Sequence, residues 1–215
     1  MKNKILISLS IFLFINNFIF SELKSQINNV IKVKVGNSLI TSIDIQNEII
    51  TNLIINKQEI TQENINKNHN YAIKALINKS IKRSEINKYE IKDYNKKDLQ
   101  NYIDKIAKTF NTNSSGLKEI FNRSGISYES FVEKYKIELI WNTLIYQVYK
   151  NQININIIEV ENEIIKINKK KNEIDLDKIK EEILFKKKQK KLNLFSRSHF
   201  SNLENSIPIN FQWKN

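Results

Sequence analysis

Few side chains in this sequence are of the types that carry out covalent chemistry. The chain has no cysteine and two histidines, His69 and His199, which excludes disulfides, zinc–thiolate sites, iron–sulfur clusters and a cysteine nucleophile. His199 lies beside serines in the stretch 196–200, but no strand–turn–helix elbow surrounds it, so we expect no Ser–His catalytic pair. His69 lies in an Asn-rich stretch and is expected to be exposed. The histidines therefore indicate no catalytic site.

Acidic residues form several groups of the kind that acid–base or metal sites use. These are Glu48, Glu59/Glu63, Glu159/Glu161/Glu163 and Glu181/Glu182. We expect them on lysine-rich helix surfaces, where carboxylates are mostly solvated or ion-paired. Three glycines in 215 residues leave no glycine-rich phosphate loop. We predict no catalytic residue, no cofactor and no metal ion, and hence a chain that is not an enzyme.

The segment from Ser127 to about Tyr149 is better suited to binding than to catalysis. Its apolar residues recur at helical spacing, and it holds more aromatic side chains than one buried stripe needs. The candidates for a binding surface are Tyr128, Phe131, Tyr135, Trp141, Tyr146 and Tyr149. The alternative is that all of them belong to the core. Adaptable binding surfaces often use methionine, but Met1 is the only one here, so isoleucine and aromatic residues would form such a surface.

The chain is strongly positive, with a net charge of +12 from 35 Lys and Arg against 23 Asp and Glu. Only Arg83, Arg123 and Arg197 are arginines. Because base readout and bidentate phosphate contacts favour arginine over lysine, we expect no nucleic-acid binding and interpret the charge as a lysine-coated soluble surface. Such a surface also suits acidic polypeptides or anionic membranes.

The first residues have the order of a secretory signal. Lys2 and Lys4 form a basic start, an apolar run extends to Phe20, and small serines follow at Ser21 and Ser25. We predict a signal peptide over residues 1–21, with cleavage within residues 21–25. The alternative is an uncleaved anchor, which normally needs about 20 continuous apolar residues. With no cysteine for a lipid and no later apolar span, we expect an exported protein with no stable membrane anchor.

The rest of the sequence shows strand patterns at its ends and helix patterns between them. Val30–Val35 alternates apolar and polar residues, and Gly36–Ser38 is a turn before a short return at residues 39–40. Apolar spacing predicts helices over about 42–54, 61–81, 93–110, 114–125, 127–149, 159–167 and 175–204. Ile207–Phe211 is expected to be an edge strand, which suits Pro208.

These elements predict a mostly α fold with a small β element formed by the N-terminal hairpin and the C-terminal strand. We expect a helical domain over residues 26–167, a linker over 168–174, and a helix and strand over 175–215 that complete the same domain. A lone hairpin is marginal in water, and the terminal strand is the best-placed partner for it. The lysine-rich stretch 186–191 is expected to project into solvent.

Five segments matter by their order along the chain: Ala75–Lys79, Asp98–Ala107, Leu117–Leu139, Ile155–Ile164 and Ile183–Ile209. In this order they resemble the periplasmic chaperone family of SurA. The resemblance covers residues 30–167 and 175–211, which is nearly all of the chain after the signal. No single motif within it is diagnostic, and the order of the segments carries the resemblance.

One departure from the family concerns catalysis. SurA-like proteins usually carry one or two parvulin-type prolyl isomerase domains between these segments. Here about 20 residues separate Ile155–Ile167 from the last helix, and residues 155–180 contain no His, Gly, Phe or Cys. The resemblance therefore implies the chaperone core without the isomerase.

The family resemblance implies an ATP-independent holdase in the periplasm. Its clients would be unfolded outer-membrane β-barrel proteins, which it would help to fold and deliver, with the outer-membrane assembly machinery as a further partner. The aromatic candidates of segment 127–149 would then contact the client. The alternatives are an exported adaptor that docks on one membrane partner and a diverged peptidyl-prolyl isomerase.

Overall fold

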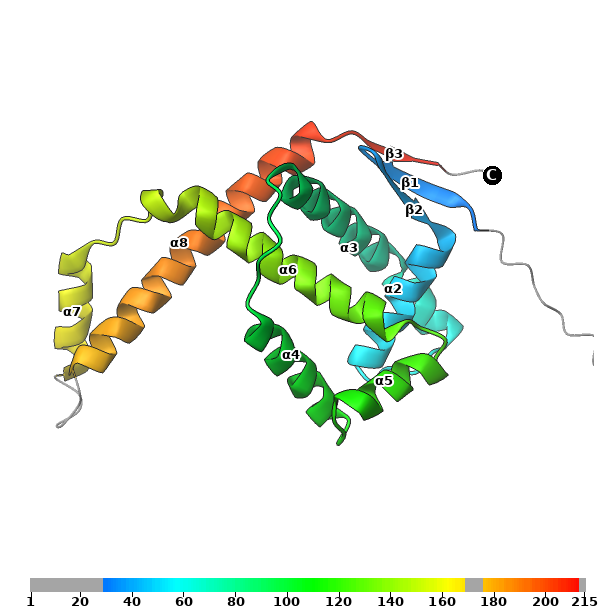
Figure 1. Cartoon of the computed structure of the whole chain (residues 1–215), viewed down its shortest axis with the longest axis horizontal. Helices are drawn as coiled ribbons and strands as arrows, with labels where there is room; N and C mark the ends of the chain where they lie inside the picture. Colours follow the sequence, from blue (N-terminus) through cyan, green and yellow to red (C-terminus); the bar gives the residue numbers. More distant parts are fainter. Residues whose placement is uncertain (1–28, 169–175, 213–215) are drawn as a thin grey trace, which may run out of the picture.

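The computed structural model describes residues 29–168 and 176–212. Figure 1 shows a helical assembly with a small sheet at one end. The elements in chain order are β1 (Ile31–Val35), β2 (Ser38–Thr41), α2 (Ser42–Ile55), α3 (Gln62–Lys88), α4 (Lys96–Thr109), α5 (Ser114–Arg123), α6 (Tyr128–Tyr149), a 3-10 turn (Lys150–Gln152), α7 (Ile157–Asn168), α8 (Leu176–Ser206) and β3 (Ile209–Phe211). The predicted signal peptide and nearly all of the predicted linker lie outside the described residues.

The sheet joins the beginning and the end of the described chain. Its strand order is β2-β1-β3, and both pairings are antiparallel. Gly36 has φ +53° at the turn between β1 and β2, a conformation that glycine adopts without strain. Its N–H donates to the carbonyl of Pro208 at 2.9 Å, next to the pairing of Val35 with Ile209. The predicted mostly α fold, with a β element built from both ends, is confirmed.

Side-chain caps fix where the helices begin. Thr41 forms a capping box with Asp44 at the start of α2, and Thr61 caps α3. The predicted start of the third helix at residue 93 is wrong, because the side chain of Asn95 accepts hydrogen bonds from the first turn and α4 begins at Lys96. The side chain of Asn113 caps α5, which begins at Ser114.

The second predicted helix is longer than its apolar spacing indicated. α3 continues to Lys88, seven residues beyond Ile81. This extension carries the buried residues Glu85 and Ile86. The carboxylate at position 85 interrupts the apolar pattern, which is why the pattern alone ended the helix too early.

Three apolar clusters make up the core. The first joins the inner face of the sheet to α2 and α3, with Phe200, Leu203, Ile207 and Ile209 from the end of the chain packed against it. The second lies among α4, α5 and the beginning of α6. The third joins α3, α6 and α8, with Trp141 buried in it. The C-terminal segment therefore completes two of the three clusters.

The molecule divides into a body and an arm. We use "arm" for α7 with residues 176–194 of α8, and "body" for residues 29–149 with residues 195–212. Figure 1 shows α8 running away from the sheet past α6, with α7 against its far end. The buried apolar residues of the arm are Val160 and Ile183, whereas the remainder of the buried core lies in the body. Within the described ranges, no helix combines the length and apolarity needed to span a bilayer.

Candidate functional site

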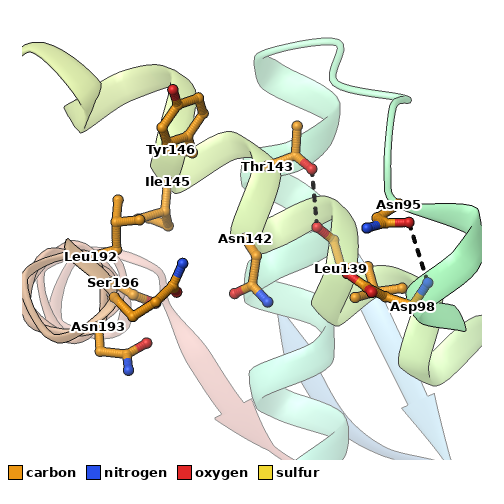
Figure 2. Close-up of a pocket in the computed structure, with 11 residues that line it drawn as sticks. Asn95, Asp98, Leu139, Asn142, Thr143, Ile145, Tyr146, Leu192, Asn193 and Ser196 are labelled. Carbon is orange, nitrogen blue, oxygen red and sulfur yellow. Dashed lines mark hydrogen bonds between the residues drawn. The ribbon is translucent and has the colours of Figure 1, made fainter. Parts of the chain in front are cut away.

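A groove of about 360 Å³ lies between α6 and α8, and the start of α4 closes one side of it. Figure 2 shows that α6 and α8 contribute most of its walls. The lining residues are Asn95, Asp98, Leu139, Asn142, Thr143, Ile145, Tyr146, Gln189, Leu192, Asn193 and Ser196. The groove thus lies where the arm leaves the body.

Buried and partly buried ion pairs hold α6 in place. Lys134 of α6 contacts Glu48 of α2 at 2.5 Å, and the Glu48 side chain is only 7% exposed. Lys82 of α3 contacts Glu138 of α6 at the same distance. Because a buried carboxylate without a partner is costly, these contacts fix the position of α6 against α2 and α3. One wall of the groove is therefore rigidly attached to the body.

A hydrogen-bonded group anchors α8 to the other helices. His199 of α8 lies 3.0 Å from the buried Glu85 of α3 through Nε2 and 2.9 Å from the Tyr149 hydroxyl of α6 through Nδ1. The Trp141 indole donates to Ser196 Oγ at 2.8 Å. These contacts join three helices beside the groove and set the direction in which the arm leaves the body.

The protonation of Tyr149 supports this anchor. Burial raises the pKa of the Tyr149 phenol, and Tyr89 and Glu85 raise it further. The hydroxyl therefore stays protonated at neutral pH and can donate to Nδ1 of His199, while Nε2–H donates to the Glu85 carboxylate. Each ring nitrogen of His199 then has one hydrogen-bond partner.

The chemistry of the groove is that of amides beside apolar side chains. Asn142 of α6 and Gln189 and Asn193 of α8 are exposed, and none of their side chains makes a hydrogen bond to another described residue. Each amide offers two N–H donors and a carbonyl acceptor, which are the groups that a polypeptide backbone presents. Leu139, Ile145, Leu192 and the ring of Tyr146 supply apolar surface beside them. This arrangement can bind an extended polypeptide.

Catalytic chemistry finds no support in the same lining. Its ionisable side chains are Asp98 and Tyr146. Neither is paired with a histidine or a second carboxylate that could form an acid–base couple. Among residues 29–168 and 176–212, no group of three or more His, Cys, Asp or Glu side chains is placed to hold a metal ion.

Two of the six aromatic candidates lie in the core. Phe131 and Trp141 are each 2% exposed. Phe131 stacks on Phe121 with ring centroids 4.8 Å apart, and Trp141 packs against α8 as described above. For these two residues, the burial agrees with the alternative interpretation, in which they belong to the core. They offer no surface to a partner.

The other four candidates differ in their surroundings. Tyr146 is 41% exposed and lines the groove. Tyr135 stacks on Tyr102 at 3.5 Å between centroids, and burial raises the pKa of the Tyr102 phenol. Tyr128 packs at its edge against the second cluster, and Tyr149 belongs to the α8 anchor. The structure therefore brings one of the six, Tyr146, into the groove.

Sequence reasoning missed the amides of the groove, the contacts of His199 and the partial burial of His69. Asparagine is so common in this chain that Asn142 and Asn193 carried no signal. His199 was correctly set apart from catalysis, but its place in the α8 anchor had no pattern in the sequence. The expected exposure of His69 is wrong, because it is partly buried beside a hollow of about 300 Å³ between α2 and α3.

A solved structure resembles this chain, although no protein-family model matches the sequence of this chain. A search of curated proteins finds no match. The similar structure comes from work describing the virulence factor PEB4 and the periplasmic protein Cj1289 of Campylobacter jejuni as two structurally related SurA-like chaperones. The two chains are 16% identical with a TM-score of 0.42, and the similarity covers 86% of this chain and 100% of the other.

Proposed function

We propose that this protein is an ATP-independent chaperone that holds unfolded polypeptides in the groove between α6 and α8. The observation that carries the proposal is the set of uncommitted amides of Asn142, Gln189 and Asn193 beside apolar surface. Amide side chains can bond to the backbone of any sequence, and the apolar wall accepts side chains of varied shape. A site of this kind recognises any polypeptide whose backbone and apolar side chains are exposed. Unfolded chains expose both.

The class of client comes from the sequence resemblance. A SurA-like core implies unfolded outer-membrane β-barrel proteins as clients, which the protein would deliver to the outer-membrane assembly machinery. Such clients contain long stretches of alternating apolar and polar residues. An extended segment of this kind would present apolar side chains to Leu192 and Tyr146 and its backbone to the amides.

The proposed location is the periplasm, reached through the signal at residues 1–21. N-terminal sequencing of the exported protein should then begin between Glu22 and Gln26. Recovery of the intact N-terminus in the membrane fraction would show an anchor instead. The chain should also leave the slow cis/trans relaxation of an X–Pro peptide unchanged; acceleration that survives removal of contaminating isomerases would support the isomerase alternative.

The test of the proposed function is suppression of aggregation. Several unrelated barrel proteins are diluted from urea with and without residues 22–215, and light scattering is followed. We expect delayed aggregation of all of them without ATP, and a loss of the effect in the groove variant Asn142→Ala/Asn193→Ala. A matched control is Asn70→Ala/Asn122→Ala, which removes two exposed amides elsewhere on the body.

The outcome separates the chaperone from the adaptor. Protection of several clients that depends on the groove amides supports the proposal. Protection of none of them, or equal protection by both double variants, contradicts it. Tight binding to a single folded membrane protein without any protection would identify the adaptor instead.

A further inference from the structure

A second groove of about 430 Å³ runs along α8 next to the first one. The lining residues are Phe185, Lys186, Gln189, Lys190, Asn193, Leu194 and Arg197. Gln189 and Asn193 line both grooves. The two grooves therefore adjoin along these amides, so one extended polypeptide can contact both.

The second groove is positively charged. Lys186 is paired with Glu182 at 2.6 Å, one turn away on the same helix. Lys190 and Arg197 are exposed, and neither forms an ion pair or hydrogen bond with any residue that the structure describes. By contrast, Lys187, one turn before Lys190, is paired with Glu159 and Glu163 of α7. Uncompensated positive charge thus faces the second groove.

Apolar side chains border this charged strip. Phe185 is 61% exposed and Leu194 is 56% exposed. They are nine residues apart on α8, which places them on opposite sides of the helix at about 100° per residue. The cations lie between them. A helix that lies on a lipid surface gathers its apolar residues on one face, so this arrangement favours a polypeptide over a membrane.

We propose that the second groove selects an acidic stretch of the polypeptide held in the first groove. Carboxylates of the bound chain would contact Lys190 and Arg197, and neighbouring apolar side chains would pack on Phe185 and Leu194. This inference rests on the proposed function and adds a preference to it. The chaperone would hold extended segments that alternate apolar and acidic residues more tightly than neutral or basic ones.

The test uses three fluorescent peptides of equal length, with valine and phenylalanine at alternate positions and Glu, Gln or Lys between them. Binding to residues 22–215 is measured by fluorescence anisotropy. At low salt we expect the Glu peptide to bind about three- to tenfold more tightly than the Gln peptide, with the Lys peptide weakest. High salt should remove most of the difference, because exposed charges are screened.

Two double variants locate the preference. Lys190→Gln/Arg197→Gln should reduce the ratio between the Glu and Gln peptides to about one, while the Gln peptide keeps its affinity. The control Lys74→Gln/Lys105→Gln removes the same charge from exposed positions on α3 and α4. It should leave most of the ratio intact.

The outcomes distinguish this inference from the proposed function. Equal binding of the Glu and Gln peptides, or an equal loss of preference in both double variants, overturns the inference and leaves the chaperone proposal standing. Failure of all three peptides and of the aggregation assay overturns both. Binding of vesicles that contain anionic phospholipid, lost in Lys190→Gln/Arg197→Gln without any peptide preference, would overturn the inference in favour of a membrane contact.

Discussion

The body and the arm meet at the groove, but they are held together in different ways. In the body, α6 is fixed by Lys134–Glu48 and Lys82–Glu138, and all three apolar clusters lie within it or at its junction with α8. The arm buries Val160 and Ile183, while Ile158 and Phe185 are each more than 60% exposed. The body therefore supplies stability, and the arm carries apolar surface that its own folding does not use.

This difference indicates how a binding protein can keep apolar residues available without losing its fold. The arm is anchored at one end, through Trp141–Ser196 and the contacts of His199. Beyond that anchor, one side of α8 lines the groove and another side packs on α7. Substitutions in the body and in the arm should accordingly separate stability from binding.

The largest effect is expected from removing the C-terminal segment, because it belongs to the body as well as to the arm. A chain that ends at Asn172 loses β3 and the packing of Phe200, Leu203, Ile207 and Ile209 on the first cluster. Burial of two large apolar side chains is worth roughly 3–6 kcal/mol, a large share of a small domain's stability. Thermal unfolding followed by circular dichroism should show a much lower and broader transition.

One result would contradict this prediction. If residues 22–172 melt as sharply and at as high a temperature as residues 22–215, the C-terminal segment is an independent appendage. The body would then be complete without it, and the comparison between body and arm would have to be redrawn.

A smaller loss is expected from breaking the anchor of the arm. His199→Ala leaves the carboxylate of Glu85, a residue that is 5% exposed, without its nearest hydrogen-bond partner. We expect a loss of about 2–3 kcal/mol in the free energy of unfolding, measured by urea denaturation. His69→Ala serves as the control, because the His69 side chain has no hydrogen-bond partner among the described residues, and its loss should cost less than about 1 kcal/mol. Equal losses in the two variants would show that the contacts of His199 add no particular stability.

Phe185→Ser should affect binding but hardly affect stability. Phe185 of the arm and Tyr71 of the body are 61% and 63% exposed, so Tyr71→Ser is a matched control. Both substitutions should change the free energy of unfolding by less than about 0.5 kcal/mol. Only Phe185→Ser should weaken binding of an unfolded client, by about fivefold, which corresponds to about 1 kcal/mol. Equal effects of the two substitutions on binding would erase the distinction between the arm and the body.

The fold could be predicted from local patterns, because most elements carry their own signals. Alternation in Val30–Val35 and the glycine at position 36 indicated the hairpin, and helical spacing indicated the helices. The start of α4 was missed because an asparagine, Asn95, caps it, and that residue type is common throughout the sequence. The full length of α3 was missed because the buried Glu85 has its partner, His199, 114 residues further along the chain.

The groove was beyond sequence reasoning for a related reason. It exists because α6 and α8 cross at a particular place, which the Trp141–Ser196 hydrogen bond and the contacts of His199 hold. Aromatic content indicated α6, which forms one wall of the groove, but it could not say which ring faces outward, so Tyr146 was grouped with Phe131 and Trp141. The amides on α8 belong to a helix whose packing partner is set only in three dimensions.

The most direct test of the central claim is to ask where an unfolded client touches the protein. A photo-reactive amino acid is placed at Asn193, which lines both grooves, or at Lys74, which is exposed on α3 away from them. Each protein is irradiated with an unfolded barrel protein and with the same protein in its folded form. We expect cross-links from position 193 to the unfolded client and only background from position 74 or with the folded client. Cross-links of equal yield from both positions, or none from position 193 while aggregation is still suppressed, would contradict the assignment of the groove.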